Sequence, residues 1–286
     1  MKLNLKCIPC YVNQVMQAAE LLQVDEETKE KMAREALEAV SNFKMGEHAF
    51  YTFNLAQDVV RKHEPKKDPY RKLKKKYNRI CLHLEPKVRK KIADSEDKFE
   101  TALRIAIAGN IIDFVQQPDM DEGIVQETIE QALVQPLNKE KIKLLKQEID
   151  KAGHILYVGD NTGEIVFDKV FIEQIGPDKV TFVVRGGPTI NDATMEDAKE
   201  VGLTKLVKVI TTGTDLPGAM VGLASPQFRE AFNQADLIIA KGQGNYEALN
   251  EEKKNIFFLL KVKCPVIAES MGNRYQVGDI VVDTAL

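Results

Sequence analysis

Three short polar segments, each following an apolar run, carry residue types that bind metal ions and phosphate groups. They are GDNTGE at 159–164, RGGPTINDAT at 185–194 and KGQGNYE at 241–247. Turns that bind phosphate through bare backbone amides usually read G-x-G-x-x-G or G-x-x-x-x-G-K-[ST], and neither pattern occurs in this sequence. The candidate site residues in the three segments are Asp160, Asn161, Glu164, Arg185, Asn191, Asp192, Lys241, Gly242 and Asn245.

The acidic residue near the start of the first segment indicates a metal ion. A carboxylate at this position would repel a phosphate directly, unless a divalent cation lies between the two. Asp160, the side-chain carbonyl of Asn161 and Asp192 make a set of hard oxygen ligands suited to Mg²⁺ or Mn²⁺. Lys241 and Arg185 would then hold a phosphoryl group and stabilise the charge of its transition state.

Each segment also has a purely structural interpretation. Asp and Asn are common helix N-caps, so GDNTGE could be a capped turn in which Glu164 faces the positive end of a helix. Asn245 could cap a helix in the same way, and RGGPTIND could be a plain turn. Because all three segments follow neighbouring apolar runs, their convergence favours one shared site over three independent turns.

The apolar pattern divides the 286-residue chain into two unlike parts. Residues 1–150 show helical periods of three and four and no convincing strand. Residues 151–286 alternate short apolar runs with helical stretches, which is typical of a mostly parallel sheet covered on both faces. We therefore predict an α/β fold with a helical domain at 1–150 and an α/β domain at 151–286. The runs predicted as strands are HILYVGD, KVTFVVRG, LVKVITTG, DLIIAKG, IFFLLKV and DIVVDTA.

This fold class also predicts where a ligand binds. In open parallel sheets the ligand lies beyond the carboxyl ends of the strands, near the point where the strand order reverses. The three polar segments follow the first, second and fourth predicted strands. We therefore expect them to meet at one edge of the sheet.

A predicted helix in the first part adds two polar candidates. In FETALRIAIAGNIIDF, Asn110 and Asp113 share one face with three apolar residues. A buried Asn or Asp needs a partner, which is either a ligand or nearby backbone. Gly109 in the same helix costs about 1 kcal/mol relative to Ala, which suggests close approach of another group.

The composition is that of a folded protein without a general attraction to nucleic acid or membranes. Hydrophobic residues make up 44%, and 40 basic against 43 acidic residues leave a net charge of −3. No apolar stretch approaches the roughly 18 residues of a membrane helix. We expect a cytoplasmic location. The basic stretch at 61–91 is interpreted as solvated surface, because few stacking aromatic residues are interleaved with its charges.

In combination, GDNTGE, RGGPTINDAT, KGQGNYE and the helical GNIIDF resemble the damage-control phosphatase family, also called the domain of unknown function 89 family. The resemblance covers nearly the whole chain. It implies a helical N-terminal part and a Rossmann-like three-layer α/β/α C-terminal part that enclose a divalent-metal site. The implied activity is the hydrolysis of phosphate monoesters with Mn, Co, Ni or Mg as the metal.

The resemblance also implies roles for individual residues. By motif position, the metal ligands of the family fall on Asp160, Asn161 and Asp192. Its phosphate-contacting lysine falls on Lys241, and its active-site asparagine in the helical part falls on Asn110. The expected partner is a small phosphorylated metabolite, either a sugar phosphate or a damaged phosphometabolite. The sequence carries no signal of a particular oligomeric state.

The attacking group remains open at this point. Either water attacks phosphorus, or Asp160 attacks and forms an aspartyl-phosphate. The D-x-D signature of one class of aspartyl-phosphatases is not found after the first strand, which favours water. Glu164 or Asp113 would then orient that water.

Two other functions are compatible with parts of the sequence. An acidic, glycine-containing turn after a first strand is also similar to S-adenosylmethionine-dependent methyltransferases. These usually have a more glycine-rich turn and a later acidic residue for the ribose, and the strand ending VVRGG offers none. The other alternative is a protein that binds a phosphometabolite without turnover.

The sequence CIPC near the N-terminus contains a cysteine pair, Cys7 and Cys10. Such a pair is similar to the prokaryotic branch of the resembled family. It could be a local structural or redox-labile pair, or half of a zinc site that would need two further ligands. A thioredoxin-like role would require a preceding strand, and the surrounding pattern is helical.

Overall fold

A computed structural model describes residues 1–65, 67–111 and 121–284 of the chain. The chain divides into two compact units, Met1–Lys72 and Leu73–Leu286. The predicted change from helices to alternating strands and helices occurs between Lys151 and Ile155, whereas the two compact units divide the chain earlier. None of the helices in the described residues is long and apolar enough to cross a membrane.

The first unit is built from helices whose apolar faces pack on one another. A short 3₁₀ turn, η1 (Leu5–Cys7), leads into α1 (Ile8–Leu22), α2 (Glu26–Ser41) and α3 (Ala49–His63). Asp25 is the N-cap of α2, and its Oδ1 accepts a hydrogen bond from the backbone N–H of Thr28 at 2.8 Å. The side chains buried between these helices include Val15, Met32, Ala36, Phe53 and Ala56.

The cysteine pair of CIPC lies at the beginning of α1. Cys7 is the N-cap residue, and Pro9 occupies the first turn. Cys10 is exposed and Cys7 is half-buried. The redox-labile pair and the zinc half-site both remain predictions.

The second unit contains the sheet and the helices that cover it. Its helices are α4 (Arg71–Ala93), which begins at the boundary, α5 (Lys98–Ile111), α6 (Glu122–Val134), α7 (Lys139–Lys151), α8 (Glu164–Ile175), α9 (Met195–Glu200), α10 (Pro226–Gln234), α11 (Gly242–Leu249) and α12 (Pro265–Ser270), with 3₁₀ turns η2 (Pro177–Lys179) and η3 (Leu203–Lys205). Its strands are β1 (Ile155–Val158), β2 (Val180–Val184), β3 (Lys208–Thr211), β4 (Leu237–Lys241), β5 (Ile256–Lys261) and β6 (Ile280–Thr284).

The strands form a mostly parallel sheet in the order β3-β2-β1-β4-β5-β6, which confirms the predicted α/β class. Only β6, at one edge of this described sheet, pairs antiparallel with its neighbour. All residues of β1, β2 and β4 are buried, as expected for continuous apolar runs in a sheet covered on both faces. The order reverses between β1 and β4, so the segments that follow these strands lie side by side.

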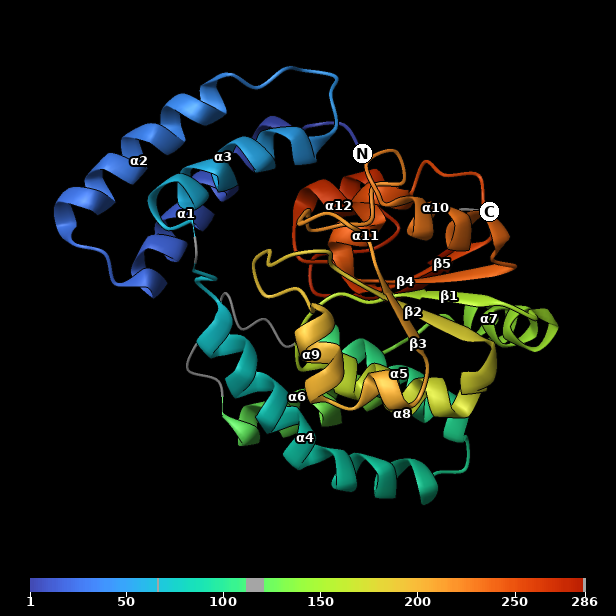
Figure 1. The fold of residues 1–286 in the computed structure, drawn as a ribbon. Coiled ribbons are helices and arrows are strands. Elements are labelled where there is room, and N and C mark those ends of the chain that lie inside the picture. The colour runs from blue at the N-terminus through green and yellow to red at the C-terminus, as the bar shows by residue number, and fades with distance from the viewer. Residues whose placement is uncertain (66, 112–120, 285–286) are drawn as a thin grey trace. The chain divides into compact units, whose positions relative to one another are not determined.

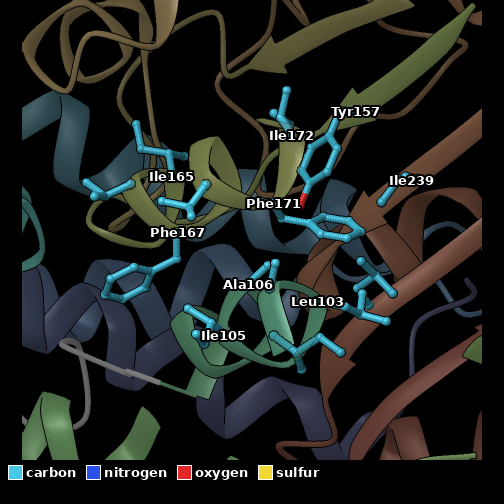
Figure 2. Close-up of a cluster of buried hydrophobic side chains, with 14 of the residues drawn as sticks. Leu103, Ile105, Ala106, Tyr157, Ile165, Phe167, Phe171, Ile172 and Ile239 are labelled. Atoms are coloured by element: carbon cyan, nitrogen blue, oxygen red, sulfur yellow. The ribbon is translucent and has the colours of Figure 1, made fainter. Parts of the chain in front are cut away.

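Helices cover both faces of this sheet. Figure 1 shows α5 and α8 on one face and α11 and α12 on the other. The core between the sheet and the helices α5 and α8 contains residues far apart in the sequence. Leu103 and Ala106 from α5 lie close to Phe171 from α8 and Tyr157 from β1 (Figure 2). Helix α5 is thus part of the same core as the strands.

Gly109 allows α5 and α8 to approach closely. A Cβ atom at this position would lie 2.9 Å from Cγ and 3.1 Å from Cα of Glu164, the first residue of α8. These separations are shorter than ordinary van der Waals contacts, so a side chain at position 109 would push the two helices apart. The close approach expected from a glycine inside this helix is confirmed.

We predict that Gly109→Ala destabilises the protein, although Ala is the better helix former. The expected loss is about 1–3 kcal/mol in the free energy of unfolding, because the methyl group would overpack the helix interface. Urea unfolding followed by circular dichroism measures it. Gly123→Ala in α6 is the matched control, since among the described residues its Cβ would meet only the exposed side chain of Asp121 at 3.2 Å. Equal midpoints for both variants would contradict the prediction.

Candidate functional site

Backbone pairing between the loops after β1 and β2 brings the predicted metal ligands together. Asn161 and Asp192 form an isolated antiparallel bridge. Next to it, the N–H of Ala193 donates to the carbonyl of Asp160 at 2.7 Å. Asp160, Asn161 and Asp192 are therefore held at adjoining strand ends, and all of them are buried.

Helix α5 reaches this place through Asn110. Its Nδ2 donates to Oδ2 of Asp160 at 2.9 Å and to Oε2 of Glu164 at 3.1 Å, and its Oδ1 accepts the N–H of Lys261 at 3.2 Å. The polar face predicted on this helix thus supplies a fully buried amide to two site carboxylates. The other residue of that prediction, Asp113, lies outside the described residues.

Glu164 is the central acceptor of the cluster. Its Oε2 also accepts hydrogen bonds from Asn161, at 2.9 Å from Nδ2 and 3.3 Å from the backbone N. Its Oε1 lies 2.5 Å from Nζ of Lys241. With 1% of its surface exposed, this carboxylate is occupied by protein donors.

Arg185 links the two predicted metal-binding carboxylates. Its Nε donates to Oδ2 of Asp192 at 2.5 Å, and its Nη2 lies 3.4 Å from Oδ1 of Asp160. The Nη2 group also donates to the carbonyl of Pro217 at 3.3 Å. The buried Nη1 has no hydrogen-bond partner among the described residues, which leaves one donor for an oxygen of a ligand.

Lys241 lies at the end of β4 and is fully buried. Its ammonium donates to the carbonyl of Ala106 at 2.9 Å, to Glu164 at 2.5 Å and to Oδ1 of Asp168 at 2.5 Å. An ammonium group has three N–H donors, so these acceptors use all of them. In this arrangement the predicted phosphate-contacting lysine serves the carboxylates behind the site.

The remaining sequence candidates contribute through the backbone. Asn245 donates to the carbonyls of Gly159 at 3.0 Å and Lys241 at 2.7 Å, which ties the β1 and β4 loops together. The carbonyl of Asn191 accepts the N–H of Thr162 at 2.9 Å. Their predicted contacts with substrate remain predictions.

Burial of several carboxylates perturbs their proton affinities. Burial raises the pKa of Asp160 well above its ordinary value, and the carboxylates of Asp192 and Glu164 raise it further. Burial also raises the pKa of Asp192, although the adjacent guanidinium opposes it. The hydrogen-bonded network holds more acidic than basic groups, namely the carboxylates of Asp160, Glu164, Asp168 and Asp192 and the cations Arg185 and Lys241.

This excess of negative charge fits a divalent cation. Asp160 and Asp192 offer carboxylate oxygens and Asn161 an amide oxygen, the hard ligands that Mg²⁺ and Mn²⁺ accept. In the part of the chain that the structure describes, no group of three or more His, Cys, Asp or Glu residues is arranged to hold a metal. The predicted set contains only two carboxylates, and a cation bound there would share them with Arg185.

Two residues of α4 support the site, and sequence analysis did not identify them. Asn78 accepts the N–H of Gly163 through Oδ1 at 2.8 Å and donates from Nδ2 to Asp197 at 3.0 Å. One turn earlier, the buried Lys74 lies near enough to Asp192 to oppose the rise in its pKa. Their spacing of four residues on the apolar face of α4 is the signal that could have revealed them.

Asp168 and Tyr157 were also missed. Oδ1 of Asp168 accepts hydrogen bonds from both Lys241 and the hydroxyl of Tyr157, the latter at 2.7 Å. Asp168 follows Glu164 by four residues in the mostly apolar EIVFDKVFI, so the two carboxylates share one helix face. This spacing was the available signal.

The chain is similar to known proteins over almost its whole length. The damage-control phosphatase ARMT1-like domain family matches residues 3–277. An uncharacterized protein of Methanocaldococcus jannaschii is 38% identical over 297 residues, covering 98% of this chain and 94% of that protein. A damage-control phosphatase of Pyrococcus horikoshii is 36% identical over 277 residues, covering 95% of this chain and 94% of the relative.

A solved structure agrees with the fold. The crystal structure of a DUF89 family protein from Pyrococcus horikoshii superimposes with a TM-score of 0.90. It is 34% identical to this chain, and the match covers 100% of both chains. The architecture described above is therefore that of a known family.

Gly242 provides a test of the site geometry. It has φ +76°, and a Cβ atom there would lie only 1.9 Å from Oδ2 of Asp160. We predict that Gly242→Ala displaces this carboxylate and lowers the free energy of unfolding. The expected cost is about 1–2 kcal/mol for the left-handed backbone and a further 1–3 kcal/mol for the overlap, measured by urea unfolding.

Gly272→Ala is the matched control for this variant. Gly272 has a similar φ of +69°, but no atom of the described residues lies within 4 Å of its added Cβ. It should show the backbone cost alone. Equal losses in the two variants would mean that Asp160 moves aside without resistance, which contradicts the geometry described.

Proposed function

We propose that this chain, which belongs to the damage-control phosphatase ARMT1-like domain family, hydrolyses phosphate monoesters of small metabolites with the help of a divalent metal ion. Sugar phosphates and damaged phosphometabolites are the proposed substrates. The printed names of its relatives support a phosphatase, and the metal dependence and the substrate class are our proposals.

One observation carries this proposal. The buried charges around the site are four carboxylates, Asp160, Glu164, Asp168 and Asp192, against three cations, Arg185, Lys241 and Lys74. A phosphate dianion would be repelled from such a place. A divalent cation held by Asp160, Asn161 and Asp192 would supply the positive charge that makes phosphate binding favourable. Mn²⁺, Co²⁺, Ni²⁺ and Mg²⁺ are the proposed ions.

The chain's own residues would orient the substrate. Nη1 of Arg185 is a buried donor available to a phosphoryl oxygen. Asn110 and Asn161 hold Oδ2 of Asp160 in place at 2.9 Å and 2.8 Å, so this carboxylate is fixed before a substrate binds. Lys241 stabilises the same network through its ion pair with Glu164.

The geometry favours water over Asp160 as the attacking group. Oδ2 of Asp160 already accepts two N–H groups, and Oδ1 faces Arg185. A carboxylate oxygen fixed in this way is poorly placed to approach phosphorus in line. In the proposed reaction the oxygen of water bonds to phosphorus as the ester P–O bond breaks, and the leaving alcohol oxygen takes a proton.

The finer description of the fold is also a proposal. The reversal of strand order between β1 and β4 supports the Rossmann-like α/β/α interpretation, because the polar segments follow these two strands. We further propose that residues 151–286 form the catalytic domain and residues 1–150 the helical domain. The contact of Asn110 with Asp160 would then join the two at the site.

We predict that the purified protein releases inorganic phosphate from a panel of sugar phosphates. Chelation should abolish this activity, and adding Mn²⁺, Co²⁺, Ni²⁺ or Mg²⁺ should restore it, because the excess carboxylate charge would otherwise repel the substrate. Asp192→Asn should lower kcat/KM by about a hundredfold or more, since it removes the negative charge of a proposed metal ligand. Free phosphate is measured colorimetrically.

Asp283→Asn is the matched control. Asp283 is also a buried carboxylate paired with two cations, Lys141 at 3.1 Å and Arg274 at 2.7 Å, but it lies on the edge strand β6. The activity of the Asp283→Asn variant should stay close to that of the wild type. Phosphate binding without turnover would instead support the non-catalytic alternative, and metal-independent binding of S-adenosylmethionine would support the methyltransferase.

A further inference from the structure

We propose that Asp168 is a positioning residue which, together with Tyr157, fixes the ammonium group of Lys241 behind the candidate metal site. The inference rests on the proposed function for its catalytic consequence. The contacts from which we infer it lie within the second unit and require no bound metal.

The contacts of Lys241 come from two helices on one face of the sheet. Ala106 supplies a carbonyl from α5, Glu164 and Asp168 supply carboxylates from α8, and Lys241 itself ends β4. All of these side chains are completely or almost completely buried. A lysine side chain has a long flexible stem, so these acceptors determine where its charge lies.

The two carboxylates that hold Lys241 differ in their other partners. Glu164 uses its second oxygen for Asn110 and Asn161, which contact the predicted metal ligand Asp160. Any change at the metal site therefore reaches Glu164. Asp168 instead accepts a hydrogen bond from the hydroxyl of Tyr157, so it is held by a group of the core.

Tyr157 is itself rigidly packed. Its ring stacks on Phe182 with centroids 5.2 Å apart and meets the edge of Phe171 at 6.5 Å. Figure 2 shows the ring of Tyr157 close to Phe171 within the hydrophobic cluster. The hydroxyl is thus a fixed donor, and it sets the orientation of the Asp168 carboxylate.

The same carboxylate preserves the charge of Lys241. Burial alone would lower the pKa of this ammonium, but the carboxylates of Asp168 and Glu164 outweigh burial and raise that pKa above its ordinary value. The charged and titratable groups around Lys241 in this structure are Glu164 and Asp168 on α8 and Tyr157 on β1 behind Asp168.

An ordinary core ion pair is the competing interpretation. Such a pair contributes to folding and has no effect on the chemistry beyond that. The contacts of Asp168 with Lys241 and Tyr157 are compatible with either interpretation. Stability and positioning can be separated by experiment.

The experiment compares Asp168→Asn with Asp283→Asn in the full-length protein. Both changes neutralise a buried aspartate that pairs with a lysine, at 2.5 Å for Asp168 and 3.1 Å for Asp283. Protein labelled with nitrogen-15 lysine is studied by NMR, where a buried, hydrogen-bonded ammonium exchanges slowly enough to be seen. Lys241→Arg assigns the resonance. Steady-state kinetics and urea unfolding are measured on the same samples.

We expect Asp168→Asn to lose the Lys241 resonance or to shift its titration to lower pH. Its kcat should fall by about ten- to a hundredfold, with a smaller change in KM, as for a misplaced group in a transition state. Tyr157→Phe should cause a smaller change of the same kind. Asp283→Asn should retain the resonance and kcat, whatever its loss of stability.

The outcomes distinguish this inference from the proposed function. An unchanged resonance and an unchanged kcat in Asp168→Asn would overturn the positioning role while phosphatase activity persists. Equal loss of kcat in Asp168→Asn and Asp283→Asn at equal stability would also overturn it. If the wild type shows no phosphatase activity but Asp168→Asn alone loses the resonance, the proposed function fails and the positioning of Lys241 stands.

Discussion

Burying the charge of Lys241 is the constraint on which the second unit depends. A buried ammonium is tolerated only when carboxylates and carbonyls surround it, and here they come from α5 and α8 on one face of the sheet. The requirement fixes Glu164, because its Oε1 must meet Lys241. Once Glu164 is fixed, its other oxygen orients the amides of Asn110 and Asn161, and both amides hold Asp160. The proposed metal site is therefore the outer layer of a charge network whose inner layer is structural.

Strand topology explains why distant segments supply this network. The strands β1 and β4 are neighbours in the sheet although they lie far apart in the sequence, and Ile155 pairs directly with Leu237. The polar residues after both strands then reach the same edge of the sheet. Parallel pairing in register, from Ile155 to Val180 on the other side, adds the segment after β2. The candidate site therefore lies at the edge of the sheet where the segments after β1, β2 and β4 meet.

Much of this arrangement could be predicted from the sequence. Apolar runs predicted all six strands described, and the runs are continuous in β1, β2 and β4 because these strands are buried on both faces. The proximity of the GDNTGE and RGGPTINDAT segments followed from the parallel topology. The partners of Lys241 and Arg185 could not be predicted, since long side chains choose among nearby acceptors that only tertiary packing defines. Asp168 was missed for a related reason, because a charged residue in a helix is normally exposed.

The sequence distance between Glu164 and Lys241 has a consequence for how the chain folds during synthesis. Helix α8 leaves the ribosome with two carboxylates on its inner face, and their counter-charge follows 77 residues later. Until β4 has been made, docking α8 onto the growing sheet would bury uncompensated negative charge, at a cost of several kcal/mol per ion. We therefore expect α8 to dock onto the sheet only after β4 has been made. The core of the unit would then form late in synthesis.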